Sequence, residues 1–370
     1  MIFIVALVAG LCVAFANGAN DNFKGVATLF GSGTTSFWRA LLWATATTFL
    51  GSLAAFILAG NLIKSFSGKG LVDDAMAAQP AFAASVALGA GLTVLLATRF
   101  GMPISTTHSL VGALVGTGMI AGTTLNAANL GWKFLLPLLI SPILAVAVTG
   151  VIYPLLRLAR GRLGITHDIC LCVGDKTLEV LPAGHQAVAI QRAEHLTATL
   201  GNEVTCQRRY RGQVWGISAA DSLDRLHFLS AGMVSFARGL NDTPKIAAML
   251  LVAPYFSASV SLILVGIAIA VGGLVSARRV ADTMSNRITT MNHGQGFTAN
   301  VITGLIVIGA SGFSLPVSTT HVSCGSLFGI GAVTGQAHRR TIMTILLAWF
   351  VTLPVAAAIA ATSYCLLASW

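Results

Sequence analysis

The sequence predicts an all-α polytopic membrane protein with two inverted-topology repeats, re-entrant or broken helices, and a small polar insert between the halves. The first observation is composition: 55% of the 370 residues are hydrophobic and only 9% are charged, whereas soluble domains carry roughly 25% charged residues. The second is the length of the apolar runs, which do not alternate and therefore indicate helices instead of barrel strands. The third is an internal repeat of two polar motifs.

Apolar segments follow one another along almost the whole chain. The 39 glycines fit a membrane bundle, because small residues allow helices to approach closely and to break where a site is needed. The first segment lacks the basic stretch and the cleavage site of a signal peptide, so we expect it to be retained as a span. The expected spans and half-spans are residues 2 to 19, 37 to 60, 81 to 98, 106 to 120, 132 to 156, 227 to 239, 245 to 276, 297 to 311, 319 to 333 and 341 to 368.

A polar stretch, residues 157–225, interrupts these segments and holds seven of the twelve acidic residues. Short alternating pieces at residues 177–181 and 187–190 favour a small strand-rich insert. Arginines flank the stretch on both sides, which predicts a cytoplasmic position by the positive-inside rule. We therefore expect a first transmembrane repeat at residues 1–156 and a second at residues 226–370.

Composition and motif spacing argue against several function classes. The net charge of +10 does not indicate nucleic-acid binding, because the basic residues are scattered through loops without an aromatic partner patch. No nucleophile elbow accompanies the serines and histidines, so we expect no enzyme. The cysteines of the polar stretch, Cys170, Cys172 and Cys206, match no standard zinc spacing, so we expect no cofactor and no metal beyond Na⁺.

The internal repeat consists of two motifs in the same order. Asn-Asp-x-x-Lys occurs at residues 20–24 and 241–245, and Pro-x-Ser-Thr-Thr-His occurs at residues 103–108 and 316–321. The Asp and the first Ser are 84 residues apart in the first half and 76 in the second, which indicates duplication. A Gly-x-x-x-Gly spacing behind each second motif permits close helix packing. The connecting loops differ in charge, which favours opposite sides of the membrane and hence inverted repeats.

The motif residues are the candidate site. A carboxylate at the end of an apolar run is costly unless it serves a function, and its repetition favours function over surface capping. The Asn amides offer a carbonyl oxygen to Na⁺ or an NH₂ to an anion, and each Lys either neutralises its Asp or contacts an anion. We expect substrate binding by Asp21, Asp242, Lys24, Lys245, Ser105, Thr106, Thr107, Ser318, Thr319 and Thr320, and coupling-ion binding by Asn20, Asn241, Asp21 and Asp242.

The two Ser-Thr-Thr runs predict helix starts that bind an oxyanion. Proline disfavours helix in the residue before it, and Ser105 and Ser318 are good N-caps. Free N–H groups, hydroxyls and the positive end of the helix dipole together suit a tetrahedral oxyanion. The alternative is that the hydroxyls bond back to helix carbonyls. For His108 and His321 we favour a structural role over a proton shuttle.

These residues resemble the inorganic phosphate transporter (PiT) family. The similarity rests on Gly18-Ala19-Asn20-Asp21 and its partner in the second half, and on the stretch from Ala97 to Gly112, and it excludes the insert. The resemblance implies inverted repeats, a midplane phosphate site and symport driven by Na⁺ or H⁺. Lys24 departs from the family, whose first motif usually reads Asn there. We expect its ammonium to weaken or abolish Na⁺ dependence by repelling a nearby cation.

The expected function is secondary transport of inorganic phosphate by alternating access, coupled to H⁺ or Na⁺, in a bacterial or archaeal inner membrane. Sulfate, arsenate or another oxyanion is the alternative substrate, because hydroxyl donors do not distinguish tetrahedral anions. A membrane-embedded anion sensor and a passive channel are alternative functions. The expected partners are phosphate, the coupling ion and lipid, with no nucleic acid. The sequence leaves open the coupling ion, the direction of transport, the role of the insert, and whether the protein is a homo-oligomer.

Overall fold

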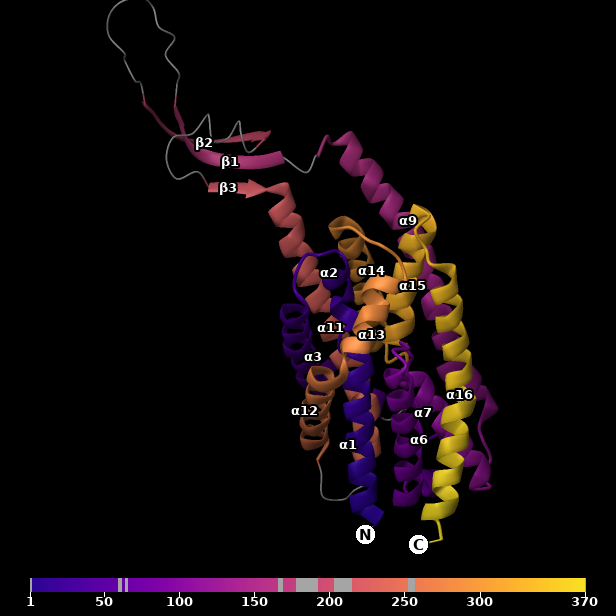
Figure 1. Ribbon diagram of the computed structural model, residues 1–370. Coiled ribbons are helices and arrows are strands. Elements are labelled where there is room, and N and C mark those ends of the chain that lie inside the picture. The colour runs from indigo at the N-terminus through magenta and orange to yellow at the C-terminus, as the bar shows by residue number, and fades with distance from the viewer. Residues whose placement is uncertain are drawn as a thin grey trace, which may run out of the picture. The chain divides into compact units, whose positions relative to one another are not determined.

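The computed structural model describes residues 2–58, 62–63, 66–165, 169–177, 192–202, 215–251 and 257–369. Contacts divide the chain into two compact units, one formed by Met1–Tyr153 with His227–Trp370 and the other by Pro154–Leu226. The first unit is a helical bundle, and the second contains the strands (Figure 1).

The helices of the chain fall before and after the strands. Those before are α1 (Ile2–Asp21), η1 (Lys24–Val26), α2 (Ala27–Gly31), α3 (Phe37–Leu58), α5 (Asp74–Ala77), α6 (Pro80–Arg99), α7 (Thr106–Ile120), α8 (Ala127–Asn129), η2 (Leu130–Leu135) and α9 (Leu136–Arg162). Those after are α11 (Ala219–Leu250), α12 (Ala258–Ser276), α13 (Arg278–Asp282), η3 (Thr283–Arg287), α14 (His293–Gly312), α15 (Thr319–Thr334) and α16 (Arg339–Leu367).

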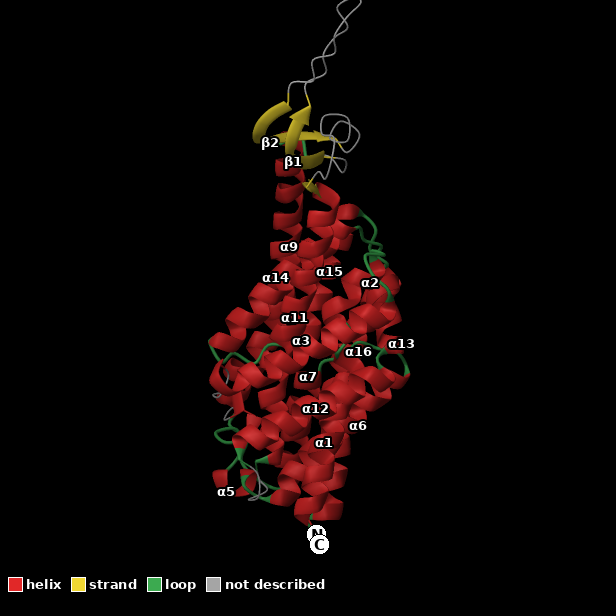
Figure 2. Ribbon diagram, turned by 90° about the vertical axis from the view of Figure 1, so that its left-hand side faces the viewer, coloured by secondary structure: helices red, strands yellow, loops and turns green. Residues whose placement is uncertain are grey.

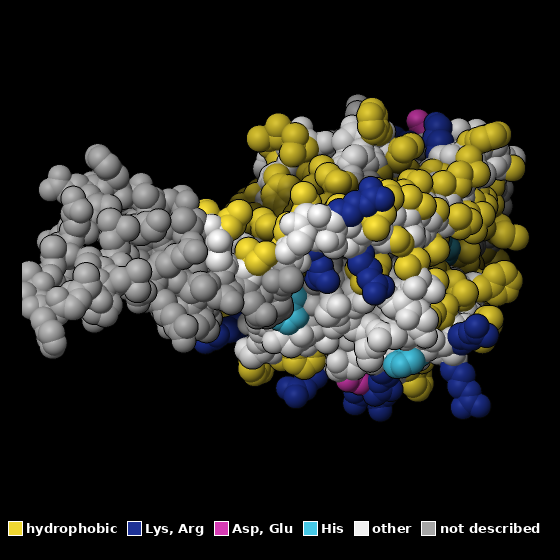
Figure 3. Space-filling model, turned by 90° about the horizontal axis from the view of Figure 1, so that it is seen from above, with side chains coloured by type: hydrophobic (Ala, Val, Ile, Leu, Met, Phe, Trp, Pro, Cys, Tyr) yellow, Lys and Arg dark blue, Asp and Glu magenta, His cyan; other side chains and the backbone are white. Residues whose placement is uncertain are grey.

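The bundle has the properties of a multi-pass membrane protein. Within the described residues, six helical segments are long and apolar enough to cross a bilayer. The long helices α1, α6 and α16 run alongside one another (Figure 2). Outward-facing side chains are apolar, since Leu139, Ile143 and Phe350 are 63%, 67% and 75% exposed. Lys and Arg side chains gather on part of one end (Figure 3). The predicted all-α membrane fold is confirmed.

Two helices of the bundle interior, α7 and α15, are too short to span a bilayer. Helices α7 and α15 have 15 and 16 residues, against about 20 needed to cross the hydrocarbon core. Both begin at the Ser-Thr-Thr runs, where the sequence predicts helix starts. The chain therefore starts new helices inside the bundle at the two places where the sequence predicts broken or re-entrant helices.

The first helix of the second half differs from the prediction. Separate segments were expected at residues 227 to 239 and 245 to 276, but α11 continues to Leu250 through Pro244, and α12 begins at Ala258. A proline removes one i→i−4 hydrogen bond, and neighbouring helices in a membrane bundle compensate for that loss. All residues from Ala237 to Leu250 are buried, which supplies this support.

Each half packs its first helix against the second helix of the other half. A Cβ on Gly18 of α1 would lie 1.9 Å from a backbone oxygen of α12, and one on Gly272 of α12 would lie 2.0 Å from a backbone oxygen of α1. The same reciprocal contact joins α3 and α11, through Gly51 and Gly239. Equivalent glycines of the two halves, Gly18 and Gly239 or Gly51 and Gly272, are 221 residues apart, as are the two Asp residues of the motifs. The packing therefore follows the sequence repeat.

The predicted Gly-x-x-x-Gly spacings also make close contacts. Gly112 and Gly116 of α7 lie against the α16 backbone, and Gly325 and Gly329 of α15 lie against the α9 backbone. A side chain at these positions would meet backbone atoms at 2.2 to 2.8 Å. Helices α7 and α15, like the first helices, are thus held by the half of the chain to which they do not belong.

The second unit contains a three-stranded antiparallel sheet in the order β2-β1-β3. Its strands are β1 (Ile169–Thr177), β2 (Arg192–Asn202) and β3 (Trp215–Ser218). In register, Leu171 pairs with Leu200 on one side and with Ile217 on the other. The polar stretch is therefore strand-rich as expected, although the alternating pieces at 178–181 and 187–190 lie outside the described residues.

Candidate functional site

The motif residues of both halves meet in one buried cluster inside the bundle. The contributing elements are the end of α1, the turn η1, the C-terminal part of α11, and the first turns of α7 and α15. Asp21, Lys24, Asp242 and Lys245 are only 1%, 4%, 3% and 1% exposed. We call this cluster the charged centre. It brings together all the residues that the sequence singles out as candidate substrate and coupling-ion contacts.

The first turns of α7 and α15 are capped in the same way. The Ser105 hydroxyl accepts a hydrogen bond from the backbone N–H of His108 at 3.1 Å, and the Ser318 hydroxyl accepts one from His321 at 3.1 Å. Both serines have extended backbones, as expected directly after the Pro-x pair. The prediction that a helix begins at each serine is confirmed.

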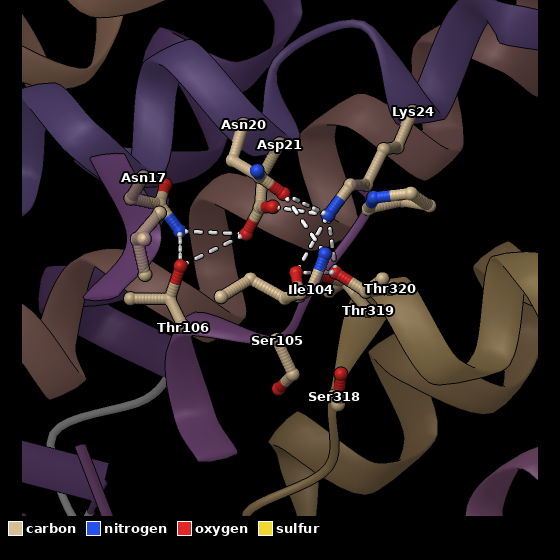
Figure 4. A network of polar contacts seen from close by, with 12 residues as sticks. Asn17, Asn20, Asp21, Lys24, Ile104, Ser105, Thr106, Ser318, Thr319 and Thr320 are labelled. Atoms are coloured by element: carbon tan, nitrogen blue, oxygen red, sulfur yellow. Dashed lines mark hydrogen bonds and ion pairs between the residues drawn. The ribbon is translucent and has the colours of Figure 1, made fainter. Parts of the chain in front are cut away.

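The Asp21 carboxylate is held from both sides (Figure 4). Its Oδ1 forms an ion pair with the Lys24 ammonium, while its Oδ2 accepts hydrogen bonds from the Asn17 amide at 2.9 Å and the Thr106 hydroxyl at 3.2 Å. Thr106 thus donates to a carboxylate and not to a helix carbonyl. The back-bonding alternative for this hydroxyl is wrong.

The Lys24 ammonium lies among four oxygen atoms. Besides Asp21, it donates to the Asn20 side-chain oxygen at 2.8 Å, to the backbone oxygen of Ile104 at 2.8 Å and to the Thr320 hydroxyl at 2.7 Å. Thr320 belongs to the other half, and its hydroxyl also donates to Ile104 at 3.0 Å. Lys24 therefore joins the starts of α7 and α15.

The second half repeats these contacts with a longer ion pair. The Lys245 ammonium donates to the backbone oxygen of Val317 at 2.7 Å and to the Thr107 hydroxyl at 2.8 Å, and lies 3.4 Å from Asp242 Oδ1. Asp242 Oδ2 accepts from the Thr319 hydroxyl at 3.3 Å and from Asn17 at 3.4 Å. Each lysine thus contacts its own Asp, the carbonyl before its own Ser, and a threonine of the other half.

The two motif asparagines bind the segments that lead into α7 and α15. The Asn20 NH₂ donates to the Thr98 hydroxyl at 2.8 Å and to Met102 O at 3.0 Å, which turns its carbonyl oxygen toward Lys24. Asn241 donates to Val317 O at 3.0 Å and accepts from Ser311 at 3.3 Å. Both asparagines therefore tie a helix carrying the Asn-Asp motif to the segment preceding a Ser-Thr-Thr run.

Arg238 and Asn17 belong to the charged centre, although sequence reasoning did not select them. Arg238 is 1% exposed and donates to the side-chain oxygens of Asn17 at 3.0 Å, Asn22 at 2.9 Å and Thr48 at 3.2 Å. Each residue stands four positions before the Asp of its motif, which places it on the same helix face. The sequence does contain a signal for Arg238, because an arginine within an apolar segment and one helical turn before Asp242 indicates a buried charged partner.

The two histidines lie one turn into α7 and α15. The rings of His108 and His321 have their centroids 4.5 Å apart, and His321 packs on Trp349 at 3.8 Å. They line an apolar cavity together with Leu138 and Phe328. Their side chains therefore pack against each other and against apolar groups, whereas the charged centre lies at the Ser-Thr-Thr runs.

The charged centre contains more positive than negative groups. Its formal cations are Lys24, Lys245 and Arg238, and its carboxylates are Asp21 and Asp242, which leaves an excess of one positive charge. The partial positive ends of α7 and α15 add to that excess. Buried charge of one sign is costly without a partner, so this arrangement favours an anionic ligand.

Several known proteins are similar to this chain over almost its whole length. A protein of Pyrococcus furiosus named as a putative phosphate permease is 26% identical over 97% of this chain and 94% of its own length. A Haemophilus influenzae protein of the same name is 26% identical over 95% of this chain and 93% of its own. A solved structure titled "The sodium-dependent phosphate transporter" superposes over 100% of this chain and 99% of that one, with a TM-score of 0.74 and 23% identity, and therefore shares the fold.

The family comparison covers both halves and both copies of each motif. The sequence model of the phosphate transporter family matches residues 17–360, from the last turns of α1 to α16. Because the match spans most of the chain, this protein belongs to the phosphate transporter family, which is a family of transporters and not of enzymes.

Proposed function

We propose that the chain carries inorganic phosphate across the membrane and that the charged centre is its binding site. The observation that carries this proposal is the convergence of two capped helix starts on a buried cluster with one excess positive charge. Helix N-termini bind phosphate through free N–H groups and the helix dipole. The names of the relatives, phosphate permeases, support the choice of phosphate among the oxyanions.

Hydroxyl groups of both helix starts supply donors to the anion. The Ser105 and Ser318 hydroxyl oxygens accept backbone N–H bonds, so their hydrogens are available to donate to substrate. Thr106 and Thr319 reach the carboxylates and orient them toward the same region. Asp21 and Asp242 can accept a hydrogen bond from the O–H that phosphate retains at neutral pH and sulfate lacks, which would favour phosphate over sulfate.

Transport requires the charged centre to open to each side in turn. Lys24 contacts Thr320, and Lys245 contacts Thr107, so both ion pairs hold the starts of α7 and α15 together. Opening on either side would separate one of these contacts. In this proposal the two inverted repeats move relative to each other around the bound anion, as in other repeat-built secondary transporters.

The proposed transport is driven by a cation gradient in a bacterial or archaeal inner membrane. The shared fold includes a protein whose title states sodium dependence, but in this chain the Lys24 ammonium fills oxygens that Na⁺ would use, which favours protons as the coupling ion. Asn20, Asn241, Asp21 and Asp242 offer the oxygen ligands that either ion would need. The strand-containing insert would face the cytoplasm, in agreement with its flanking arginines.

Uptake of radiolabelled phosphate into proteoliposomes tests the proposal. We expect saturable uptake that is lost in Asp21→Asn and Asp242→Asn and kept in Asp282→Asn, whose carboxylate is 45% exposed outside the charged centre. Sulfate in excess should compete weakly. Strong competition by sulfate, with uptake of sulfate itself, would keep the site and replace the substrate. Absence of any oxyanion uptake by folded protein would contradict the proposed function.

A further inference from the structure

The Lys24 ammonium occupies the centre of an oxygen cage. Its four neighbours are the Asn20 amide oxygen, an Asp21 carboxylate oxygen, the Ile104 carbonyl and the Thr320 hydroxyl. An ammonium has three hydrogens, so the cage contains one oxygen more than it can satisfy with separate hydrogen bonds. We call these four oxygens the Lys24 cage.

Lys245 occupies a related cage. Its ammonium contacts the Val317 carbonyl, the Thr107 hydroxyl and the Asp242 carboxylate, which are the counterparts of three oxygens around Lys24. It also lies 5.7 Å from the Phe66 ring centroid. The two cages share a carboxylate, a backbone carbonyl and a threonine hydroxyl, each draws on both halves, and two lysines at the same position of the repeat fill them.

This combination of oxygens is typical of a site for a hard metal cation. Carboxylate, amide and backbone carbonyl oxygens are the ligands of such ions, and membrane carriers coordinate Na⁺ with carbonyls freed where helices break. Ile104 and Val317 supply carbonyls of this kind, directly before the helix starts. The Asn20 NH₂ is bound to Thr98 and Met102, so only its oxygen faces the cage.

We infer that Lys24 and Lys245 are tethered cations that occupy two sodium-type sites and make phosphate transport by this protein independent of Na⁺. The inference rests on the proposed function, because it names the cation requirement of the same site. A buried ion pair also needs acceptors for the ammonium hydrogens that its carboxylate does not take. The Lys24 cage offers one acceptor more than those hydrogens require, and it includes a backbone carbonyl at a helix start and a hydroxyl from the other half of the chain, as a cation site does.

The inference has a specific consequence for lysine substitutions. Lys24→Ala removes the side chain that fills the cage and leaves its oxygens beside an unpaired Asp21, so Na⁺ should enter. Lys24→Met also removes the charge but keeps a chain of similar length in the cage, so Na⁺ should be excluded. The two neutral variants lose the same ion pair and differ only in whether the cage is open.

The experiment compares phosphate uptake with Na⁺ or choline outside, at fixed pH and clamped voltage. Na⁺ should change uptake by the wild-type protein less than about twofold. It should raise uptake by Lys24→Ala about tenfold or more, because the transport-competent state of this variant forms only with Na⁺ bound. Lys24→Met should stay inactive with either cation. Lys133→Ala, which changes an exposed lysine, is the matched control and should behave like the wild type.

A binding measurement separates this inference from the proposed function. Thermal unfolding in detergent without phosphate should shift upward with Na⁺ concentration in Lys24→Ala but not in Lys24→Met or the wild type, since a ligand that binds only the folded state stabilises it. If Lys24→Ala does not fold, Lys245→Ala provides the same comparison. Absence of phosphate transport would overturn the proposed function alone, because the unfolding shift does not depend on it.

Two results would overturn the inference. One is strong Na⁺ stimulation of wild-type uptake, which would show that the lysines do not replace the ion. The other is an equal response of folded Lys24→Ala and Lys24→Met to Na⁺, whether both respond or neither does, which would reduce Lys24 to an ion-pair partner of Asp21.

Discussion

The two halves of the charged centre share a frame but differ in charge and in tightness. In the first half, α1 ends at Asp21, and Lys24 lies on a separate turn with four oxygen neighbours. In the second half, Asp242 and Lys245 lie on the continuous helix α11, with 3.4 Å between carboxylate and ammonium. Four residues before each Asp, the first half has Asn17 and the second has Arg238.

The difference shows how a duplicated frame becomes an asymmetric site. The backbone features of the repeat, namely the cross-half glycine contacts and the two serine caps, are kept in both copies. The two copies differ in charge, because only the second has a cation, Arg238, four residues before its Asp. A symmetric pair of Asp and Lys residues would be formally neutral, so this arginine supplies the excess positive charge on which the proposed anion binding depends.

The largest effect is expected from removing the two carboxylates one at a time. Asp21→Asn leaves the tightly paired Lys24 as an unpaired buried charge and should lower the free energy of unfolding by about 3–5 kcal/mol. Asp242→Asn should cost less, because its ion pair is already long at 3.4 Å. Thermal unfolding in detergent measures both. Equal destabilisation would show that the two halves are energetically alike.

Arg238 is the next position that distinguishes the halves. Arg238→Met should raise the phosphate concentration for half-maximal uptake roughly tenfold to a hundredfold, because it removes a charge and charged hydrogen bonds of about 1.5–3 kcal/mol. Arg287→Met is the matched control, since that guanidinium is 66% exposed outside the centre. If Arg238→Met leaves the phosphate concentration for half-maximal uptake unchanged, excess positive charge is not the basis of anion binding.

A smaller effect is expected at the turns that precede the two prolines. Gly101 has φ 68°, and its counterpart Ser314 has φ 59°, the one positive φ outside glycine among the described residues. Gly101→Ser should destabilise the fold by about 1–2 kcal/mol, because a side chain is strained there and would lie 3.1 Å from a backbone oxygen. Ser314→Gly should stabilise it by about 1 kcal/mol or less. Opposite shifts of the unfolding midpoint check the pair.

The smallest effect is expected outside the charged centre, at Asp282. Hydrogen bonds from Asn286 and then Arg287 hold the pKa of this carboxyl below its ordinary value of 3.8. A lowered pKa contributes stability above the ordinary value, and that stability is lost as pH falls through the lowered pKa. The carboxylate is 45% exposed, so Asp282→Asn should cost about 0.5 kcal/mol or less at pH 7. A larger loss, or a loss of uptake, would extend the functional region beyond the centre.

Sequence reasoning located the centre but not all of its members. The repeated Asn-Asp-x-x-Lys and Ser-Thr-Thr runs identified the helix starts and the buried charged residues, because capping and buried charge are local rules. They left open whether each Lys pairs with its Asp or contacts an anion. Arg238 was missed because its partners, Asn17, Asn22 and Thr48, come from the other half of the chain. The continuity of α11 through Pro244 was missed because helices packed around it support the interrupted ladder.

The most direct test of the account is to locate a tetrahedral oxyanion in the protein itself. A structure determined with arsenate, whose arsenic atom scatters anomalously, would give its position without interpretation of shape. The account predicts one anomalous peak within hydrogen-bonding distance of the first-turn hydroxyls of both α7 and α15, close to Arg238. A peak at any other place in the bundle, in protein that carries phosphate, would contradict the assignment of the charged centre as the binding site.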